Sequence, residues 1–398
     1  MVSGPPPTVR AEGRNMKRCF RERFRGKKIL VTGHTGFKGS WLSIWLTELG
    51  AEVIGYSLEP PTNPSNFDLC HLQNRMTHIV GDVCDQQKLD AVFAQYKPEI
   101  VFHLAAQPIV LASYQDPHET FRTNVMGTAC VLDAIRKAGG VNAFVGVTSD
   151  KVYKDQGWYW GYRESDTLGG YDPYSASKAA AETVIASYRQ SWNQQWQEDQ
   201  AVKRFSVAPT AIASVRAGNV IGGGDFADFR ILPDFMRACM AGEPMQLRNP
   251  NSIRPWQHAL EPISGYLWLA VHMLDHPEQY NDAWNFGPAE REPVVCEALV
   301  KLAAELWGEG CRGYTKQPVK VAAHETKILR VNWDQAAYRL NWMPAYSWQE
   351  AVEETVLWWQ AYHAQLQSGQ VPDMYGVCVD HIQVFVDKAR DKDISWAS

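Results

Sequence analysis

Short apolar runs alternate with helix-length segments over the first half of the chain. The runs are rich in β-branched residues and read as buried parallel strands at 28–32, 51–56, 76–80, 100–104, 143–148 and 211–220. Helical patterns are expected between them, at 41–49, 89–96, 124–138 and 174–187. This alternation predicts an α/β fold built on a doubly wound parallel sheet with right-handed crossovers.

Beyond residue 225 the pattern becomes irregular, with Pro-rich turns, Trp-rich segments and shorter helices. We therefore expect a first domain over 28–225 and a smaller C-terminal lobe mainly over 226–398, with some segments returning to the first domain. Residues 1–27 are rich in Pro, Gly and Arg with little apolar periodicity, which predicts a disordered N-terminal extension. The polar stretch 193–210 is interpreted as a surface loop.

Composition narrows the function classes. The formal net charge of −5 shows no basic surface for nucleic acid or anionic lipid. The eight cysteines form no C-x-x-C pair, so no metal site is expected. The chain has no run of about 18 apolar residues, so no membrane span is expected. The N-terminus lacks the apolar core of a secretory signal. A cytoplasmic setting follows as the expectation.

A glycine-rich turn follows the first expected strand. Gly33, Gly36 and Gly39 stand in GHTGFKG and lead directly into a helix. Such a helix N-terminus offers free N–H groups and a positive dipole end to a pyrophosphate, and the glycines allow close backbone approach. A plain strand-to-helix turn is the alternative, but the flanking strand and helix favour a Rossmann-type dinucleotide-binding loop.

Other positions are expected around the same cofactor. Asp82 follows the third strand and is placed to hydrogen-bond an adenine amino group, with a turn cap as the alternative. The tip of the second strand lacks the usual ribose-binding acid. It also lacks an arginine for a 2′-phosphate, and for this second reason NAD is favoured over NADP. The further expected cofactor-binding residues are Thr35, Phe37, Val83, Leu104, Ala105, Ala106, Gln107 and Thr123, together with Tyr174 and Lys178.

Tyr174 and Lys178 form a Y-x-x-x-K motif on an expected helix, so that the phenol and the ammonium share one face. A nearby cation favours the phenolate and brings Tyr174 into range as a base. Ser149, at the tip of the fifth strand, is expected to hydrogen-bond the substrate oxygen, and Thr148 is the competing candidate. Asp150 and Lys151 follow at once and indicate proton chemistry beyond hydride transfer.

These motifs together resemble the extended short-chain dehydrogenase/reductase family and, within it, the nucleotide-sugar 4,6-dehydratases, those of CDP-glucose in particular. The resemblance runs from about residue 28 to about residue 362. Most sugar 4,6-dehydratases have an Asp-Glu pair where this chain has Asp150-Lys151, and the CDP-glucose enzymes carry Lys there. The motifs are GHTGFKGSWL, HLAAQPIV, TFRTNVMGT, VTSDKVY, YSASK, RAGNVIGGGD, LRNPNSIRPWQH, EPISGYL and WNFGP.

The resemblance implies a lyase that dehydrates CDP-glucose to CDP-4-keto-6-deoxyglucose through an internal redox cycle with NAD. Tyr174 would take the C4 hydroxyl proton as hydride leaves C4, Lys151 the C5 proton, and Asp150 would protonate the departing C6 hydroxyl. It also implies a homodimer or higher homo-oligomer. The implied substrate-binding residues are Gln107, Asn219, Arg230, Leu232 and Arg254.

Three alternatives remain. A C4 epimerase on the same fold would need Tyr174, Lys178 and Ser149 but not the Asp150-Lys151 pair. A 4,6-dehydratase acting on another nucleotide sugar is the second. A non-catalytic NAD-binding sensor is the third, and the retained Tyr-Lys pair argues against it.

Overall fold

A seven-stranded parallel sheet forms the centre of the protein. The computed structural model describes residues 15–202, 210–289, 294–316 and 329–398. The strand order is β10-β6-β5-β4-β1-β2-β3, and every neighbouring pair is parallel. The doubly wound sheet expected from the sequence is thereby confirmed. The strands are β1 (Lys28–Thr32), β2 (Glu52–Ser57), β3 (Thr77–Val80), β4 (Ile100–His103), β5 (Ala143–Val147), β6 (Ala211–Ala217) and β10 (Ala283–Phe286).

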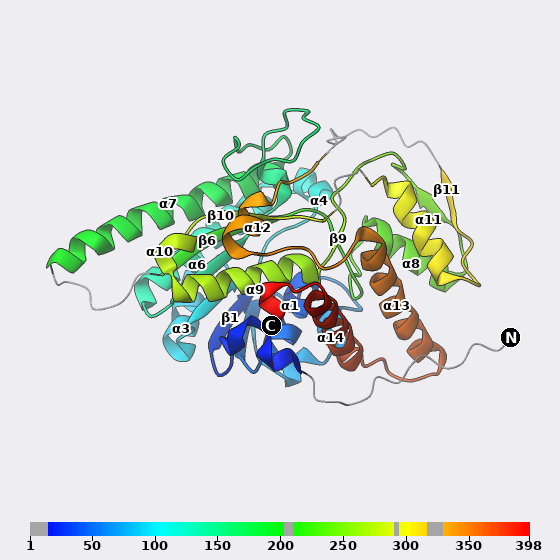
Figure 1. The fold of residues 1–398 in the computed structure, drawn as a ribbon, viewed down its shortest axis with the longest axis horizontal. Coiled ribbons are helices and arrows are strands. Elements are labelled where there is room, and N and C mark those ends of the chain that lie inside the picture. Colours follow the sequence, from blue (N-terminus) through cyan, green and yellow to red (C-terminus); the bar gives the residue numbers. More distant parts are fainter. Residues whose placement is uncertain (1–14, 203–209, 290–293, 317–328) are drawn as a thin grey trace.

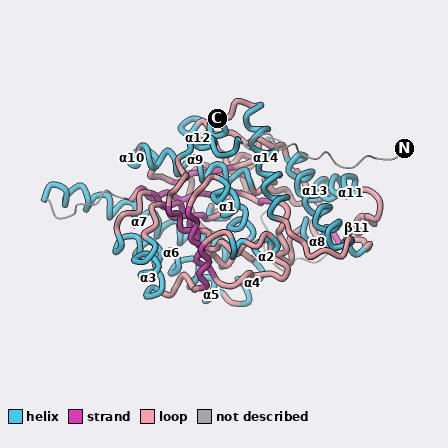
Figure 2. The backbone as a smooth tube through the Cα atoms, turned by 90° about the horizontal axis from the view of Figure 1, so that it is seen from below, coloured by secondary structure: helices cyan, strands magenta, loops and turns pink. Residues whose placement is uncertain are grey.

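Helices cover both faces of this sheet, which explains why the strands are apolar on both sides. In β1, Leu30 packs in one hydrophobic cluster with α3 (Gln86–Tyr96) and α6 (Gly127–Ala138). Ile29 and Val31 point the other way, into the cluster with α1 (Phe37–Glu48) and α9 (Leu260–Asp275). Figures 1 and 2 show the resulting three layers.

A second lobe lies beside the carboxyl ends of the strands and contains α8, α11 and α13 (Figure 1, right). No helix within the described ranges is long and apolar enough to cross a bilayer. The stretch 226–398 also supplies α9 and β10 to the central layers and α14 against α1. Its elements include α8 (Ile231–Ala241), β8 (Met245–Leu247), β9 (Gln257–His258), α10 (Pro277–Tyr280), α11 (Cys296–Trp307), β11 (Tyr314–Lys316), α12 (Asp334–Leu340), α13 (Trp348–Gln367) and α14 (Tyr375–Asp391).

The sequence and the structure differ at two strand and helix ends. The strand expected over 211–220 stops at Ala217, and β7 (Val220–Ile221) pairs with β9 in a separate two-stranded sheet. The helix α7 (Pro173–Val202) continues far beyond residue 187, so the surface loop expected from 193 is wrong as far as 202. The reason is local, because this segment lacks Gly and Pro and is rich in helix-forming Gln and Glu. Residues 203–209 lie outside the described residues. The remaining helices of the first half are α2 (Asn66–Leu69), α4 (Val110–Gln115), α5 (Pro117–Phe121) and a π-turn at Arg122–Met126.

The N-terminal segment is ordered from residue 15, so the expected disorder is wrong for 15–27. Asn15–Glu22 forms helical turns, and Phe20 is completely buried. Its ring stacks on Trp396 at 5.3 Å between centroids and meets the edge of Trp45 at 5.4 Å. A few aromatic side chains thus anchor a segment whose average composition is polar. Residues 1–14 lie outside the described residues.

Candidate active site

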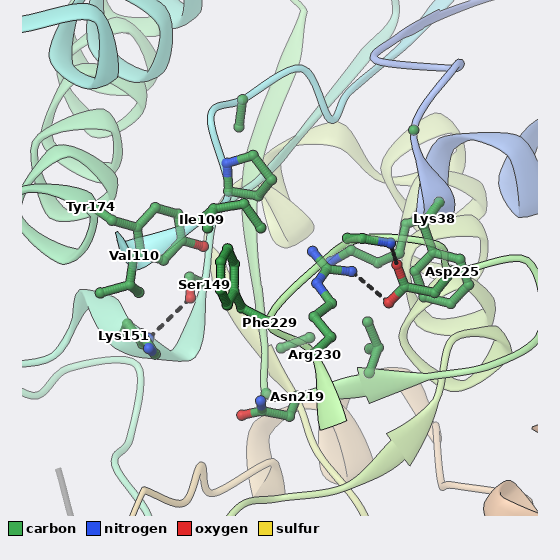
Figure 3. A pocket seen from close by; sticks show the side chains of 18 of the residues that line it. Lys38, Ile109, Val110, Ser149, Lys151, Tyr174, Asn219, Asp225, Phe229 and Arg230 are labelled. Atoms are coloured by element: carbon green, nitrogen blue, oxygen red, sulfur yellow. Dashed lines mark hydrogen bonds and ion pairs between the residues drawn. The ribbon is translucent and has the colours of Figure 1, made fainter. Parts of the chain in front are cut away.

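One large cavity lies at the carboxyl ends of the parallel strands, where ligands bind in doubly wound sheets. Its volume is about 1560 Å³, which exceeds the ~300–1,000 Å³ of an ordinary ligand pocket. It is lined by the glycine loop, by the segment that follows β5 and by the α8 region. In Figure 3, Lys38, Asp225 and Arg230 lie on one side, and Ser149, Lys151 and Tyr174 lie on the other. The cavity therefore has room for more than one small molecule.

The glycine loop is shaped for a diphosphate. Gly33 has a φ of +73°, and a Cβ there would stand 2.7 Å from the backbone nitrogen of Ala105. A Cβ on Gly39 would stand 2.0 Å from the Gly33 carbonyl oxygen. Gly36 is the N-cap of α1, whose first N–H groups have no partner within the helix. The loop therefore fits a dinucleotide such as NAD, with its diphosphate at the α1 N-terminus.

The residues expected to bind the cofactor mostly line this cavity. The exception is Gln107, whose Nε2 donates to Thr120 Oγ1 at 2.9 Å and whose Oε1 accepts from the Ile109 N–H at 2.6 Å. Gln107 is absent from the cavity wall, so the structure does not support its direct contact with cofactor or substrate. Those that do line it are Gly33, Thr35, Gly36, Phe37, Gly39, Asp82, Val83, Leu104, Ala105, Ala106, Thr123, Tyr174 and Lys178.

Asp82 lines the cavity and also caps a turn. Its Oδ1 accepts from the Cys84 N–H at 2.8 Å, and its Oδ2 pairs with Arg122 at 2.7 Å. Burial works to raise the pKa of Asp82, but these contacts overcome it and hold the pKa below its usual value. The turn-cap role is therefore present, and a contact with adenine remains a proposal.

Tyr174 and Lys178 stand one turn apart on the first turns of α7, as their spacing predicts. Burial raises the pKa of Tyr174 to about 12, opposed by its contact with Ser149. Burial lowers the pKa of Lys178 to about 7, and its Nζ donates to the Val147 carbonyl at 3.2 Å. The expected lowering of the Tyr174 pKa is thus not seen in the protein alone.

Ser149, Asp150 and Lys151 follow β5 in a tight turn at the cavity wall. Ser149 Oγ accepts from the Lys151 N–H and donates to Asp150 Oδ1, both at 3.2 Å (Figure 3). Asp150 is 3% exposed, and its Oδ2 has no hydrogen-bond partner in the described part of the chain. Burial raises the pKa of Asp150, opposed by Lys151 and Ser149. A raised pKa is the direction that a general acid requires.

Thr148, the competing candidate to Ser149, is engaged elsewhere. Its hydroxyl donates to Glu182 Oε1 at 2.5 Å. Glu182 in turn forms a buried ion pair with Arg216 at 2.9 Å, and Arg216 donates to Tyr153 Oη at 2.8 Å. Thr148 therefore belongs to a network beneath the site, and Ser149 is the hydroxyl left to face a substrate.

Four of the five expected substrate-binding residues line the same cavity. Asn219 stands in the break between β6 and β7, and Leu232 is a buried residue of α8. Arg230 precedes α8 and pairs with Asp225 at 2.7 Å, while Arg254 Nη1 donates to the Ile253 carbonyl at 2.7 Å.

Comparisons with known proteins identify the family. The sequence profile of the family described as GDP-mannose 4,6 dehydratase matches residues 30–355. The chain belongs to the GDP-mannose 4,6-dehydratase family.

Two further findings place the chain within this dehydratase family. A CDP-glucose 4,6-dehydratase from Salmonella typhimurium is 44% identical over 340 residues, which cover 85% of this chain and 92% of the relative. The resemblance to nucleotide-sugar dehydratases is thereby confirmed. A dTDP-D-glucose 4,6-dehydratase from Mus musculus is 27% identical over 357 residues, covering 84% of this chain and 89% of that one.

The fold of the family is also seen in solved structures. The dTDP-glucose 4,6-dehydratase of Streptomyces venezuelae, with NAD and TYD bound, superposes with a TM-score of 0.69 at 20% identity, covering 85% of this chain and 98% of that one. An epimerase from Methanothermobacter thermautotrophicus has a TM-score of 0.72 at 22% identity, covering 89% and 98%. Dehydratases and epimerases thus share this fold, so the fold alone does not choose between them.

Two cavity residues of this family member were missed from the sequence. Lys38 follows Phe37 in the glycine loop and lies near Arg230 on the same side of the cavity (Figure 3). Phe229 has a φ of +62°, a 61% exposed side chain and Arg248 over its ring at 5.5 Å. The signal for Lys38 was available, because a lysine in the first turn of a helix opposes the helix dipole. Within the described ranges, no group of three or more His, Cys, Asp or Glu side chains could hold a metal ion.

Proposed function

We propose that this protein is a lyase that converts CDP-glucose into CDP-4-keto-6-deoxyglucose and water, with NAD as a regenerated cofactor. The carrying observation is the buried Asp150 next to Lys151, at the same cavity wall as Tyr174 and Lys178. The 44% identity to a CDP-glucose 4,6-dehydratase over most of both chains supports the nucleotide choice.

The cavity divides between two ligands in this proposal. NAD binding belongs to 28–225, with the glycine loop holding the diphosphate and Lys178 the nicotinamide ribose. Nucleotide-sugar binding belongs mainly to 226–398 together with Asn219. When bound, NAD supplies the hydride acceptor for C4 and the hydride donor for C6.

Tyr174 acts first, as the base toward the C4 hydroxyl. Its phenol is buried, and the Arg230 cation on the facing wall favours the phenolate. Ser149 hydrogen-bonds the same C4 oxygen, because the hydroxyl of Thr148, which also lines the cavity, is already engaged with Glu182 and the Val215 carbonyl. The result is a 4-ketone, which acidifies the neighbouring C5–H bond.

Lys151 and Asp150 then complete the elimination. Lys151 takes the C5 proton, and Asp150 gives its proton to the C6 hydroxyl, which leaves as water. In the elimination, the C5–H and C6–O bonds break and a C5–C6 double bond forms. This double bond is then reduced by addition of a hydride at C6 and a proton at C5. Overall one water is lost and no external oxidant is consumed.

The C4 epimerase remains the nearest alternative. It would use Tyr174, Lys178 and Ser149 but would give Asp150 and Lys151 no task. Burying an aspartate with an unpaired oxygen costs stability. The dehydratase reaction uses this buried carboxyl as an acid, whereas the epimerase reaction does not.

The test is product analysis with purified protein, NAD and CDP-, dTDP-, GDP- and UDP-glucose in separate reactions. Loss of 18 mass units from CDP-glucose alone is the expected result. An unchanged mass with an inverted C4 centre would establish the epimerase instead. Binding of NAD without turnover of any sugar would support a non-catalytic sensor.

We further infer that the enzyme acts in the cytoplasm as a homo-oligomer. All eight cysteines are free in the structure, which suits a reducing compartment. Leu111, Tyr114, Phe121 and Met126 present exposed apolar side chains on the elements that pack against α7. Such a patch is typical of a subunit interface. Sedimentation that gives a clean monomer mass would contradict the oligomer.

A further inference from the structure

Lys38 is a cation in an unfavourable place. It is the second residue of α1, after the N-cap Gly36, and no acidic residue stands in that first turn. The positive end of the helix dipole disfavours a lysine there. No carboxylate in the described ranges forms a salt bridge with its ammonium. A cation kept under these conditions at a cavity wall calls for an anionic ligand.

The charges around Lys38 come from four other elements. Arg230 before α8 and Lys178 on α7 are cations, and Asp150 after β5 is the nearby acid. The ring of Tyr266 on α9 lies 6.0 Å from Nζ. Asp150 is a poor counter-ion, because burial raises its pKa.

Arg230 is already neutralised by a carboxylate. Its guanidinium pairs with Asp225 at 2.7 Å, and that carboxylate is almost completely buried (Figure 3). The Arg230–Asp225 pair therefore has no net charge, whereas the adjacent Lys38 has no carboxylate partner among the described residues. Lys38 thus contributes positive charge to this wall that no carboxylate neutralises.

We propose that Lys38 binds a diphosphate oxygen of the nucleotide-sugar substrate, next to Arg230. This inference rests on the proposed function, since it takes a nucleotide sugar as the second ligand. The NAD diphosphate is served by backbone N–H groups at the start of α1, while the Lys38 side chain has Arg230 and Asp150 as neighbours. The cofactor loop thus contributes one side chain to substrate binding.

The test compares Lys38→Met and Lys38→Arg with the natural protein by titration calorimetry, using CDP, CDP-glucose and NAD as separate ligands. Lys88→Met, an exposed lysine on α3, controls for the loss of one charge. Lys38→Met should weaken the affinity for CDP and for CDP-glucose at least tenfold, and should change the affinity for NAD less than threefold. Lys38→Arg should restore most of the lost affinity.

Two results would overturn the inference. The first is that Lys38→Met leaves the affinity for CDP and for CDP-glucose unchanged. The other is weakened NAD binding with unchanged CDP binding, which would assign Lys38 to the cofactor diphosphate. If the natural protein binds CDP but turns over no CDP-glucose, the proposed function fails while the Lys38 assignment is still decided by CDP binding.

A pH series keeps the inference testable should Lys38→Met fold poorly. Burial, and then Arg230, lower the pKa of Lys38 to about 8, with Asp150 opposing. CDP affinity of the natural protein should therefore fall between pH 7 and pH 9.5 as the ammonium loses its proton. The same pH series is recorded for Lys38→Arg. Lys178 is present in both proteins, so a difference between the two pH profiles of CDP affinity reports on Lys38. Identical profiles would contradict the proposal.

Discussion

Asp150 shows how burial can prepare a single side chain for chemistry. A carboxyl that is 3% exposed with one unpaired oxygen favours its neutral form, and the neutral form is the proton donor. Lys151 beside it opposes this shift without abolishing it. The pair thus places a proton donor and a proton acceptor next to each other at the cavity wall.

Replacement of Asp150 by Asn should remove the acid while keeping shape and hydrogen bonds. We expect kcat for CDP-glucose to fall by about 10²–10⁴-fold, the usual contribution of a general acid, with CDP-glucose affinity within about threefold of the natural value. Product formation followed by mass spectrometry, with calorimetry for binding, measures both. Asp155→Asn changes an exposed aspartate at the same cavity and should leave kcat unaltered. An Asp150→Asn enzyme with full kcat would exclude the acid role.

At this scale the sequence predicted some residues and missed others for identifiable reasons. Tyr174 and Lys178 follow from helix periodicity, and Ser149 from its place after a strand. Gln107 also follows a strand, yet its side chain turns to Thr120 and the Ile109 N–H. The place of Lys38 in the first turn of a helix was a signal in the sequence, but its neighbours Arg230 and Asp150 are far away along the chain. Side-chain direction and charge environment depend on tertiary packing, which spacing does not report.

Helix α7 joins the catalytic residues to the buried core. Tyr174, Lys178 and Glu182 recur every four residues on one face. Glu182 accepts from Thr148, Ser214 and Arg216, so this one carboxylate ties α7 to β5 and β6. Burial pushes the pKa of Glu182 up, but Arg216 and the hydrogen bonds outweigh it and hold the pKa below its ordinary value.

Glu182→Gln should therefore destabilise the whole domain. Arg216 would keep a buried charge without its counter-ion, which costs about 3–5 kcal/mol. Urea unfolding gives the free energy of unfolding. Asp133→Asn breaks the partly exposed Arg136–Asp133 pair and should cost less than about 1 kcal/mol. Equal losses of unfolding free energy in the two variants would show that the buried pair contributes no more to stability than the partly exposed one.

Element boundaries were predictable only where the pattern was strong. The strands β1 to β5 agree with their expected ranges to within one or two residues. The strand β10 was not recognised individually, because AWNF is four residues long and its apolar character does not distinguish it from the surrounding Trp-rich segments. Gly218 follows the break after Ala217, and a Cβ there would stand 2.3 Å from Pro255 Cγ, so the close approach of Pro255 requires a glycine at this position.

At the scale of the whole molecule, the two ends of the described chain close over one face. Phe20 packs between Trp45 of α1 and Trp396 near the C-terminus. Arg23 pairs with Asp275 at the end of α9 at 2.6 Å. The segment expected to be disordered is therefore part of the core that supports α1, and α1 carries the glycine loop.

Phe20→Ala should cost about 3–5 kcal/mol of unfolding free energy, since it leaves a cavity in this aromatic cluster. The loss should appear as a lower urea midpoint. Arg18→Ala removes an exposed neighbour in the same segment and should stay within about 0.5 kcal/mol of the natural protein. If Phe20→Ala were as stable as Arg18→Ala, the N-terminal segment would not be part of the cooperative core.

Buried histidines give the molecule a defined response to acid. Burial lowers the pKa of His34, His103 and His258 to about 3 each, against about 6.5 in an unfolded chain. The unfolded chain thus binds more protons between pH 6.5 and pH 3. Their contribution to stability is complete above pH 6.5 and is lost progressively as the pH falls toward 3.

Each histidine should remove about 1.4 kcal/mol per pH unit well below pH 6.5, so the three together remove about 4 kcal/mol per unit. Urea unfolding between pH 6 and pH 4 measures this slope. His103→Gln keeps a hydrogen-bonding side chain toward Thr32 and Thr128, and should reduce the slope by about 1.4 kcal/mol per unit. The exposed His118→Gln serves as the matched control and should leave the slope as it is. An unchanged slope in His103→Gln would mean that His103 is protonated in the folded protein, which would contradict the assignment of a buried neutral imidazole.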